Sequence, residues 1–555
     1  MTSSGVAVSA SGAAADAISR HVPELVRDGF AGKLFHQDPD LWGPEAHSEA
    51  SKRLSWVGLP RSSRPLLGEI AALRSELDEQ AGHPLDHVVL CGMGGSSLAP
   101  EVICATAGVE LTVLDSSDPD YVRHALQDRL DRTVVVVSSK SGSTAETDSQ
   151  KRAYEQAFRD AGIDPTHRIV LVTDPGSPMD EAGRKAGYHV VNADPNVGGR
   201  YSALTAFGLV PSGLAGVDIE GLLDDAEAVA DLLAADDEAN PALRLGSALG
   251  GTAPLRDKVL LTDAGTEITG FGDWAEQLIA ESTGKNGTGL LPVVVGTGGP
   301  AADQLADDEL VVLLQATDGD DADGGSEPKG DAVAVSGTLG AQLLLWEAAV
   351  ATAGRLLGIN PFDQPDVESA KQAARDLMAQ GGGTTDEPAF TDGAVEVRAL
   401  GGSWLGDARD VSAAVEALFA QLDRDRGYLA VMAYLDRASD SALAEVRPVL
   451  ARRLSRPVTF GWGPRFLHST GQYHKGGPAT GVYLQVTTVP EKDLEVPGQD
   501  FSFGVLIAAQ AAGDAQVLAE HGRPVLRLHL TDHDRGLAQL RQALGLPAHP
   551  TEQPT

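Results

Sequence analysis

Between about residue 86 and residue 217 the chain repeats one order of residue types: an apolar run, a turn rich in glycine or serine, and an amphipathic segment. Apolar runs of this order occupy residues 87–92, 111–114, 133–138, 167–173 and 189–192. Short, nearly continuous apolar runs suit strands buried on both faces, and amphipathic segments suit helices. Strands and helices that alternate with short turns predict a parallel, doubly wound α/β sheet.

Two further α/β blocks follow. Strand patterns at residues 258–263, 290–295 and 309–316 accompany helical patterns at 274–283 and 340–358. After residue 388, strand patterns at 395–400, 428–435, 457–462, 481–487 and 524–530 again alternate with helical ones. A chain of this length exceeds one compact domain. We predict an N-terminal helical extension (1–55), two doubly wound domains (56–217 and 218–380) and a C-terminal α/β domain (389–550).

Two stretches have no apolar period. Residues 317–331 read TDGDDADGGSEPKGD, which is acidic and glycine-rich and predicts a surface loop or a disordered segment. Residues 381–388 read GGGTTDEP, which is typical of a linker between domains.

The composition excludes several partner classes. A net charge of −36 argues against nucleic acid and anionic lipid, which bind basic surfaces. No run of about 18 apolar residues predicts a membrane span, and the N-terminus is not a good secretory signal. Cys91 and Cys104 give no disulfide framework, so we expect a reducing, cytoplasmic location. If the substrate is an anion, the site must supply local cations, because the overall field repels it.

Two turns have the composition of a phosphate cradle. Residues 92–97 (GMGGSS) and residues 138–144 (SSKSGST) each connect an apolar strand to a helix. Hydroxyls, a lysine and backbone N–H groups at a helix N-terminus favour a phosphate. The first turn lacks the dinucleotide pattern of glycines and alone is weak evidence, since many such turns are only tight loops. At adjacent strand ends of one sheet, the two turns would flank a ligand crevice.

Four further residues are candidates for a functional site because of the sequence around them. Arg200 follows two glycines and could stabilise developing negative charge, although an exposed loop arginine is a common alternative. Glu281 ends an amphipathic segment and could act as a general base if burial raised its pKa, although a solvated helix-end glutamate is the default interpretation. Gln364 and Lys371 could face one site, or Lys371 could be an ordinary surface lysine.

His468 and His474 lie in a glycine-containing stretch, RFLHSTGQYHKGG. Cysteine or carboxylate ligands at metal spacing do not accompany them, so a metal is not expected. A proton-transfer role near neutral pH suits a histidine better, and a purely structural role stays open.

Five motifs together resemble glucose-6-phosphate isomerase (phosphoglucose isomerase): GMGGSS, SSKSGSTAET, VGGRYSALTAFGLVP, AESTGKNG and GINPFDQPDVESAK. They occur in the family's order between about residues 86 and 380. The chain most resembles an actinobacterial type that is also found as the isomerase half of transaldolase–isomerase fusions and that carries an extra C-terminal domain. The resemblance implies two SIS-type (sugar isomerase) domains and interconversion of glucose 6-phosphate and fructose 6-phosphate without metal or nucleotide.

The resemblance also implies roles. Glu281 would move a proton between C1 and C2, Arg200 would stabilise the cis-enediolate, and Lys371 would help to open the sugar ring. The residues expected to bind the substrate are Gly95, Ser96, Ser139, Lys140, Ser141, Thr144 and Gln364. The family is typically a homodimer, which is the assembly we expect.

One departure concerns the ring-opening histidine. The family places it soon after the base, but no histidine lies between Glu281 and Lys371. The segment LHSTGQ at residues 467–472 resembles the family's histidine segment displaced downstream. We therefore hypothesise that the C-terminal domain supplies His468, with His474 in reserve.

Two alternative functions stay open at this stage. The first is a dual phosphoglucose/phosphomannose isomerase, because the sequence does not show what lines the C2 side of the sugar. The second is a non-catalytic SIS module that senses sugar phosphates. A sensor would need the serine-rich turn but not Glu281, Arg200 and Lys371 together.

Overall fold

The computed structural model describes residues 5–296, 305–317, 328–379 and 387–546. The chain divides into two compact units. The first unit comprises Met1–Asp115 and Leu126–Gln364, and the second comprises Ser116–Ala125 and Pro365–Thr555. Both sheets of the two predicted SIS-type domains belong to the first unit. The domain limits 56–217, 218–380 and 389–550 stay predictions.

The first sheet of the first unit contains five parallel strands in the order β3-β2-β4-β5-β6. The strands are β2 (His87–Gly92), β3 (Thr112–Leu114), β4 (Thr133–Ser138), β5 (Ile169–Thr173) and β6 (His189–Asn192). The chain passes from β2 to β3 on one side and from β4 to β5 on the other. The strand order therefore reverses between β2 and β4, the place where doubly wound sheets bind ligands at the carboxyl ends of their strands.

Helices cover both faces of this sheet. Successive side chains of a strand point to opposite faces, so the side chains of β4 show which helices lie on each face. Val134 and Val136 of β4 join the core that includes α10, whereas Val137 and Leu171 face the groove beside α8 and α9. The helices of this part are α5 (Pro65–Ala81), α6 (Leu98–Thr106), α8 (Ala145–Asp160), α9 (Pro178–Ala186) and α10 (Ala206–Ala215).

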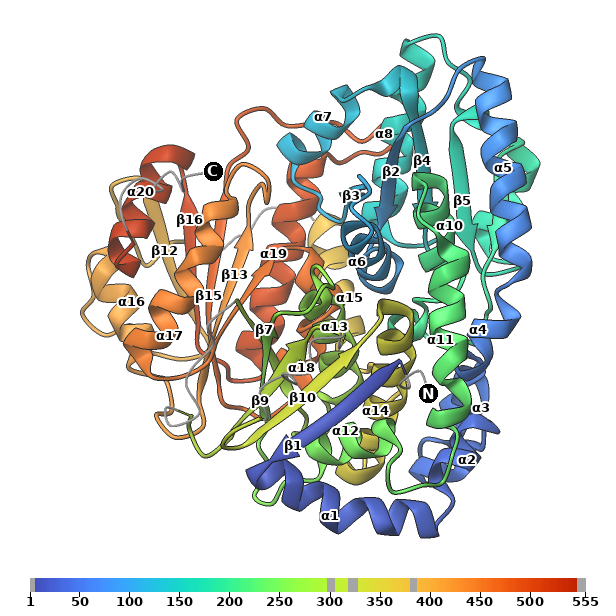
Figure 1. The fold of residues 1–555 in the computed structure, drawn as a ribbon. Helices are drawn as coiled ribbons and strands as arrows, with labels where there is room; N and C mark the ends of the chain where they lie inside the picture. The colour runs from blue at the N-terminus through green and yellow to red at the C-terminus, as the bar shows by residue number, and fades with distance from the viewer. Residues whose placement is uncertain (1–4, 297–304, 318–327, 380–386, 547–555) are drawn as a thin grey trace. The chain divides into compact units, whose positions relative to one another are not determined.

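The second sheet contains four parallel strands and one antiparallel edge strand, in the order β1-β10-β9-β7-β8. The strands are β1 (Val6–Ser11), β7 (Lys258–Ala264), β8 (Leu291–Val295), β9 (Glu309–Gln315) and β10 (Ala332–Gly337). The N-terminal extension is thus not wholly helical. Its first element, β1, pairs with β10 along the edge of the sheet, as Figure 1 shows.

Around this sheet, α14 is buried along nearly its whole length because it packs against α11, α12 and α13. The helices are α1 (Gly12–Arg27), α2 (Phe30–Phe35), α3 (His47–Arg53), α4 (Leu59–Ser62), α11 (Ile219–Leu233), α12 (Pro241–Gly250), α13 (Phe271–Thr283) and α14 (Leu339–Leu357).

The second unit is built on a six-stranded mixed sheet in the order β11-β12-β16-β15-β13-β14. The strands are β11 (Phe390–Asp392), β12 (Val395–Leu400), β13 (Tyr428–Tyr434), β14 (Val458–Trp462), β15 (Gly481–Thr488) and β16 (Val525–Leu530). The helices are α15 (Val367–Ala379), α16 (Val411–Phe419), α17 (Val446–Leu454), α18 (Gly471–Gly476), α19 (Phe503–Glu520), α20 (His533–Leu544) and the first part of α7 (Pro119–Gln127). This sheet, with four parallel strands, confirms the third α/β fold predicted from the sequence.

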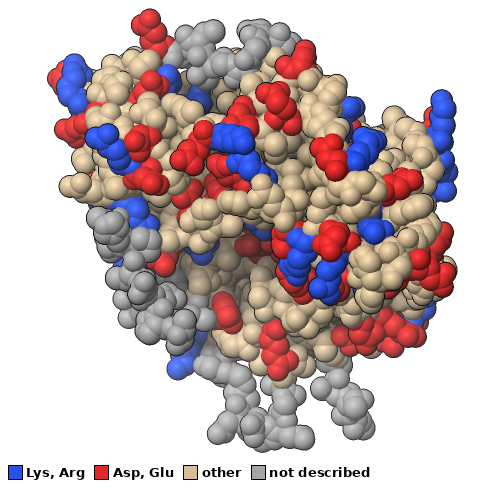
Figure 2. Space-filling view, turned by 90° about the horizontal axis from the view of Figure 1, so that it is seen from above, with Lys and Arg blue, Asp and Glu red and all other residues tan. Residues whose placement is uncertain are grey.

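Parts of two predicted features lie outside the described residues: 318–327 of the predicted acidic loop and 381–386 of the predicted linker. Among the helices that are described, none is long and apolar enough to cross a membrane. On the face seen in Figure 2, carboxylate side chains are widely spread, and most Lys and Arg side chains lie beside them rather than in a basic patch.

Candidate active site

Two turns at the carboxyl ends of the first sheet touch one another. The short helix η3 (Gly94–Ser96) follows β2, and η6 (Gly199–Tyr201) follows β6. A Cβ atom on Gly95 would lie 1.9 Å from the carbonyl oxygen of Gly199, so only glycine allows this approach. Ser202 Oγ also donates to the carbonyl oxygen of Gly95 at 3.3 Å. The predicted glycine-rich turn thus fixes the backbone that carries Arg200, beside the half-buried Ser96.

The serine turn lies at the end of β4, next to β2, as predicted. Ser139 Oγ and Thr144 Oγ1 are 3.2 Å apart, and the backbone N–H of Gly142 donates to Ser139 Oγ at 3.1 Å. Thr144 is the N-cap of α8 but makes no side-chain bond to its first turn. The helix N-terminus therefore adds backbone N–H groups and a positive dipole end to these hydroxyls, and Ser141 lies exposed on the same turn. This geometry suits a phosphate group.

Lys140 has other partners. Its ammonium forms an ion pair with Asp174 at 2.8 Å and donates to the carbonyl oxygens of Val197 at 2.9 Å and Pro195 at 3.3 Å. The side chain thus braces the loop between β6 and Arg200. A direct contact between Lys140 and phosphate stays a prediction.

Arg200 is buried, with 3% of its surface exposed, and its guanidinium is held on every side. Nε donates to Ser282 Oγ at 2.9 Å and Nη1 to Gln364 Oε1 at 2.7 Å. Nη2 donates to the carbonyl oxygens of Pro361 at 2.7 Å and Asp363 at 2.9 Å. These bonds join three segments distant in sequence and give a fixed, desolvated positive charge.

Glu281 lies beside this charge. The residue is in the last turn of α13, is 8% exposed, and has one carboxylate oxygen 3.6 Å from Arg200 Nη1. The amide of Gln277, one helical turn earlier, donates to the same oxygen at 3.2 Å. The structure therefore brings together three predicted site residues: Arg200, Glu281 and Gln364. Gln277 was not predicted, although its spacing of four residues from Glu281 on a helix was a usable signal.

Lys285 also belongs to this cluster and was not predicted. Its ammonium forms an ion pair with Asp363 at 2.7 Å, and its side chain is 1% exposed. Burial, reinforced by the nearby Arg200 charge and opposed by Asp363 and Glu281, lowers the pKa of Lys285 to about 8. The signal in the sequence was its place in the AESTGKNG motif, four residues after Glu281.

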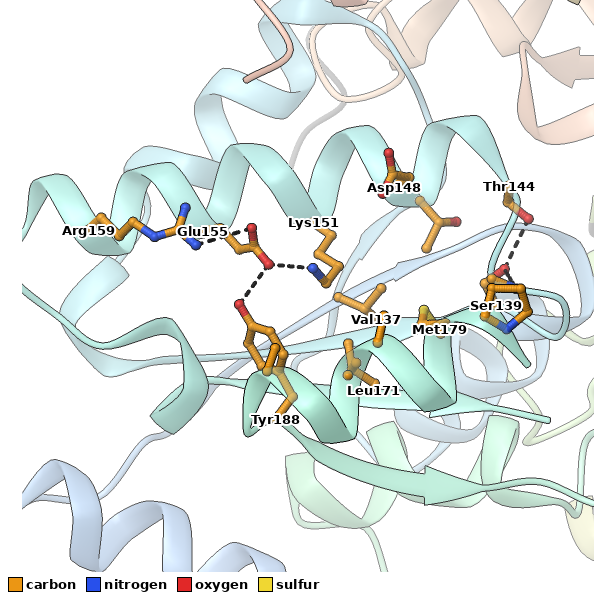
Figure 3. A pocket seen from close by; sticks show the side chains of 16 residues that line it. Val137, Ser139, Thr144, Asp148, Lys151, Glu155, Arg159, Leu171, Met179 and Tyr188 are labelled. Atoms are coloured by element: carbon orange, nitrogen blue, oxygen red, sulfur yellow. Dashed lines mark hydrogen bonds and ion pairs between the residues drawn. The ribbon is translucent and has the colours of Figure 1, made fainter. Parts of the chain in front are cut away.

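A cavity of about 420 Å³ adjoins the serine turn between α8 and α9. Figure 3 shows Ser139 and Thr144 at one end, and Lys151, Glu155 and Tyr188 at the other. Glu155 accepts from the Tyr188 hydroxyl at 2.7 Å and also binds Lys151, so these three side chains are hydrogen-bonded to one another. Arg200, Glu281 and Gln364 are not among the lining residues, so the cavity extends behind the serine turn rather than around the buried charges.

In the second unit, His474 is unsuited to proton transfer near neutral pH. The side chain is 2% exposed, its Nδ1 lies 3.0 Å from the Tyr428 hydroxyl, and its ring stacks on that of Tyr428. Burial lowers the pKa of His474 to about 3, with the charges of Lys475 and Arg523 acting in the same direction. Burial and the lowered pKa argue against the reserve hypothesis for His474.

His468 ends η9 (Arg465–His468) and is half-buried. Gln472, four residues later, accepts from the backbone N–H of Asp366 at 3.0 Å and donates to its carboxylate at 2.7 Å. Lys371 lies on α15, and its side chain is outside the described part of the structure. The roles of His468 and Lys371 stay predictions.

The described residues contain one group of metal-type ligands, His87, Glu110 and Asp128. Arg129 donates to the carboxylates of both Glu110 and Asp128, at 3.0 Å and 2.9 Å. The two carboxylates thus already have a cationic partner, and the group belongs to an ion-pair network near the amino ends of the strands of the first sheet.

Comparisons with known proteins show which family this chain is similar to. A family model described as phosphoglucose isomerase matches residues 70–246. A probable glucose-6-phosphate isomerase of Haloarcula marismortui is 31% identical over 360 residues, covering 55% of this chain and 81% of the relative. One from Natronomonas pharaonis is 31% identical over 355 residues, covering 55% and 82%. The crystal structure of a hypothetical protein from Thermus thermophilus aligns with a TM-score of 0.54 and 25% identity, covering 66% of this chain and 97% of that one.

Proposed function

Because this chain belongs to the phosphoglucose isomerase family, we propose that it interconverts glucose 6-phosphate and fructose 6-phosphate. The observation that carries the proposal is the pairing of Glu281 with a fixed Arg200 in a desolvated setting. A proton next to a carbonyl is removed only when a base and a stabiliser of the enediolate are both within reach. A sensor of sugar phosphates would need neither group, so the pairing favours an enzyme.

The chemistry divides among the clustered groups. Glu281 accepts the proton from C2 of the open-chain sugar and returns it to C1. The guanidinium of Arg200 stabilises the enediolate between these steps, and its fixed hydrogen bonds mean that no reorganisation is needed when charge develops. The serine turn binds the phosphate far from the reacting carbons, so that binding energy positions the sugar.

Ring opening is assigned to His468, with help from Lys371. Supporting this, Gln472 of the histidine segment binds Asp366, which follows Gln364 by two residues. The same proposal includes a homodimer and a cytoplasmic location, the latter supported by two free, buried cysteines.

A coupled assay for fructose 6-phosphate tests the activity, with mannose 6-phosphate assayed in parallel. We expect turnover of glucose 6-phosphate, and Glu281→Gln should lower kcat by about 10² to 10⁴-fold while the variant still binds sugar phosphate. A wild-type chain that binds sugar phosphates without isomerising them would support the sensor instead. Comparable turnover of mannose 6-phosphate would establish the dual isomerase.

His468→Ala tests the ring-opening role. We expect slow turnover of the cyclic anomers and little change in the exchange of the C2 proton of open-chain substrate with solvent. Wild-type turnover of both anomers by this variant would remove His468 from the mechanism. Light scattering during size-exclusion chromatography measures the oligomeric state.

A further inference from the structure

The backbone at Lys285 is fixed by a tight turn. Lys285, Asn286, Gly287 and Thr288 form a two-residue hairpin loop in which the N–H of Lys285 donates to the Thr288 carbonyl at 3.1 Å and the reverse bond is 3.0 Å. Asn286 and Gly287 have φ values of 56° and 75°. Asn-Gly is the residue pair that favours two successive positive φ angles. Lys285 is therefore held in a definite position directly after the helix that carries Glu281.

The side chain of Lys285 ends on the segment that follows α14. Its ammonium donates to the carbonyl oxygen of Asn360 at 2.8 Å, the carbonyl oxygen of Asp363 at 2.5 Å and the Asp363 carboxylate at 2.7 Å. All three acceptors lie within four residues of one another. A buried ammonium is costly unless it is paired and hydrogen-bonded, so these contacts constrain both partners.

Arg200 binds the same short segment. Its guanidinium donates to the carbonyl oxygens of Pro361 and Asp363 and to the side chain of Gln364. The Asp363 carbonyl thus accepts from both Lys285 and Arg200. Two buried cations can share this segment because both donate to its carbonyl oxygens and Lys285 also pairs with the Asp363 carboxylate.

We propose that Lys285 is a positioning residue for the isomerisation. By holding residues 360–363 together with Arg200, Lys285 keeps Gln364 and the guanidinium in place relative to Glu281. The inference rests on the proposed function, in which these three groups act on the substrate. Loss of the ammonium would leave Asp363 without its cation and would release the segment on which two bonds of Arg200 depend.

The proposal predicts a pH signature. The charged groups that face Lys285 are Arg200, which favours its neutral form, and Asp363 and Glu281, which favour its charged form. The clamp needs the charged ammonium, so its contribution to activity is present well below pH 8 and is lost as pH rises through that value. Lys285→Arg stays charged, so its alkaline limb should move to higher pH. Asp363→Asn removes a favourable charge, so its limb should move to lower pH.

The experiment compares Lys285→Met, Lys285→Arg and Asp363→Asn with the wild-type chain in steady-state kinetics between about pH 6 and pH 9. For Lys285→Met we expect kcat to fall by about 10²-fold, as for a small misplacement of catalytic groups, with a smaller change in KM. Lys285→Arg should recover much of the loss. Hydrogen exchange should become faster in residues 285–290 and 359–364 of Lys285→Met but not in α8.

Lys258 offers a matched control. It is also a fully buried lysine of the first unit, but its ammonium pairs with Asp257 at 2.8 Å and Asp308 at 3.1 Å. Lys258→Met should lose stability while its folded fraction keeps the wild-type kcat and alkaline limb. If folded Lys285→Met keeps wild-type kcat and pH profile, the positioning role is wrong. Absence of isomerase activity in the wild-type chain would instead overturn the proposed function, and the exchange data would still report on the clamp.

Discussion

At the scale of single residues, Arg200 shows why its side-chain type matters. Its planar guanidinium reaches Ser282, Gln364 and two main-chain carbonyls at once. A lysine has three donors on one point and cannot reproduce this fork. Arg200→Lys should therefore lower kcat by about 10² to 10³-fold, the effect of losing a preorganised donor, with a smaller change in KM. Steady-state kinetics on glucose 6-phosphate measures it.

The matched control is Arg61→Lys. Arg61 is 63% exposed in its side chain and pairs with Glu227 and Asp231 on the surface, where such pairs contribute little. Its replacement should leave kcat and KM unchanged. If Arg200→Lys and Arg61→Lys have the same kcat and KM, the guanidinium of Arg200 has no special role.

His474 makes stability depend on pH. The folded chain holds the imidazole neutral, since its pKa is lowered to about 3 from 6.5, whereas the unfolded chain binds a proton below about pH 6.5. The contribution of His474 to the free energy of unfolding is therefore present above pH 6.5 and is lost as the pH falls below that value. Between pH 7.5 and pH 5 the contribution of this one group is about 2 kcal/mol.

His474→Asn keeps an acceptor near the Tyr428 hydroxyl but cannot bind the proton. We expect the variant to be less stable than the wild-type chain at pH 7.5 and to lose less stability on acidification. Denaturant unfolding at both pH values, followed by Trp fluorescence, gives the two differences. Parallel losses in both proteins would show that other groups dominate.

At the scale of elements, local sequence patterns were enough to predict the first sheet. The features that the sequence did not predict depend on partners that lie far away along the chain. The valine run of β4 and the serine turn after it were predictable because each satisfies a local rule. The strand β1 was not, because VAVSAS is short and its partner β10 lies more than 300 residues away. The contacts of Lys140 and Lys285 were hidden for the same reason, since their acceptors include carbonyls of distant segments.

The contact between η3 and η6 gives a prediction for two elements at once. In Gly95→Ala, the added Cβ would meet the Gly199 carbonyl, so the two turns must separate and the backbone of Arg200 must shift. We expect kcat/KM to fall by at least about 10²-fold. Gly68→Ala in α5 is the control, since a Cβ there meets nothing within 4 Å, and it should add about 0.5–1 kcal/mol of stability. Unchanged kinetics in Gly95→Ala would show that the turns tolerate separation.

At the scale of the whole molecule, charge is the dominant property. The chain has 79 acidic and 43 basic side chains, so most cations can have a carboxylate neighbour while 36 negative charges stay uncompensated. Such an excess destabilises the compact state by self-repulsion. It also explains why the cations near the candidate site are buried and held by several acceptors, since an anionic substrate must be attracted locally against the overall field.

Screening should therefore stabilise this protein. Salt weakens both attractions and repulsions at the surface, but repulsions prevail when carboxylates exceed cations by this margin. The Tm should rise as KCl is increased from about 0.05 M to 1 M, where the screening length shrinks to about 3 Å. Calorimetry with KCl and with sucrose of equal osmolality separates screening from solute exclusion, because sucrose carries no charge. A Tm that rises equally in sucrose, or falls in KCl, would show that self-repulsion does not limit the stability of this chain.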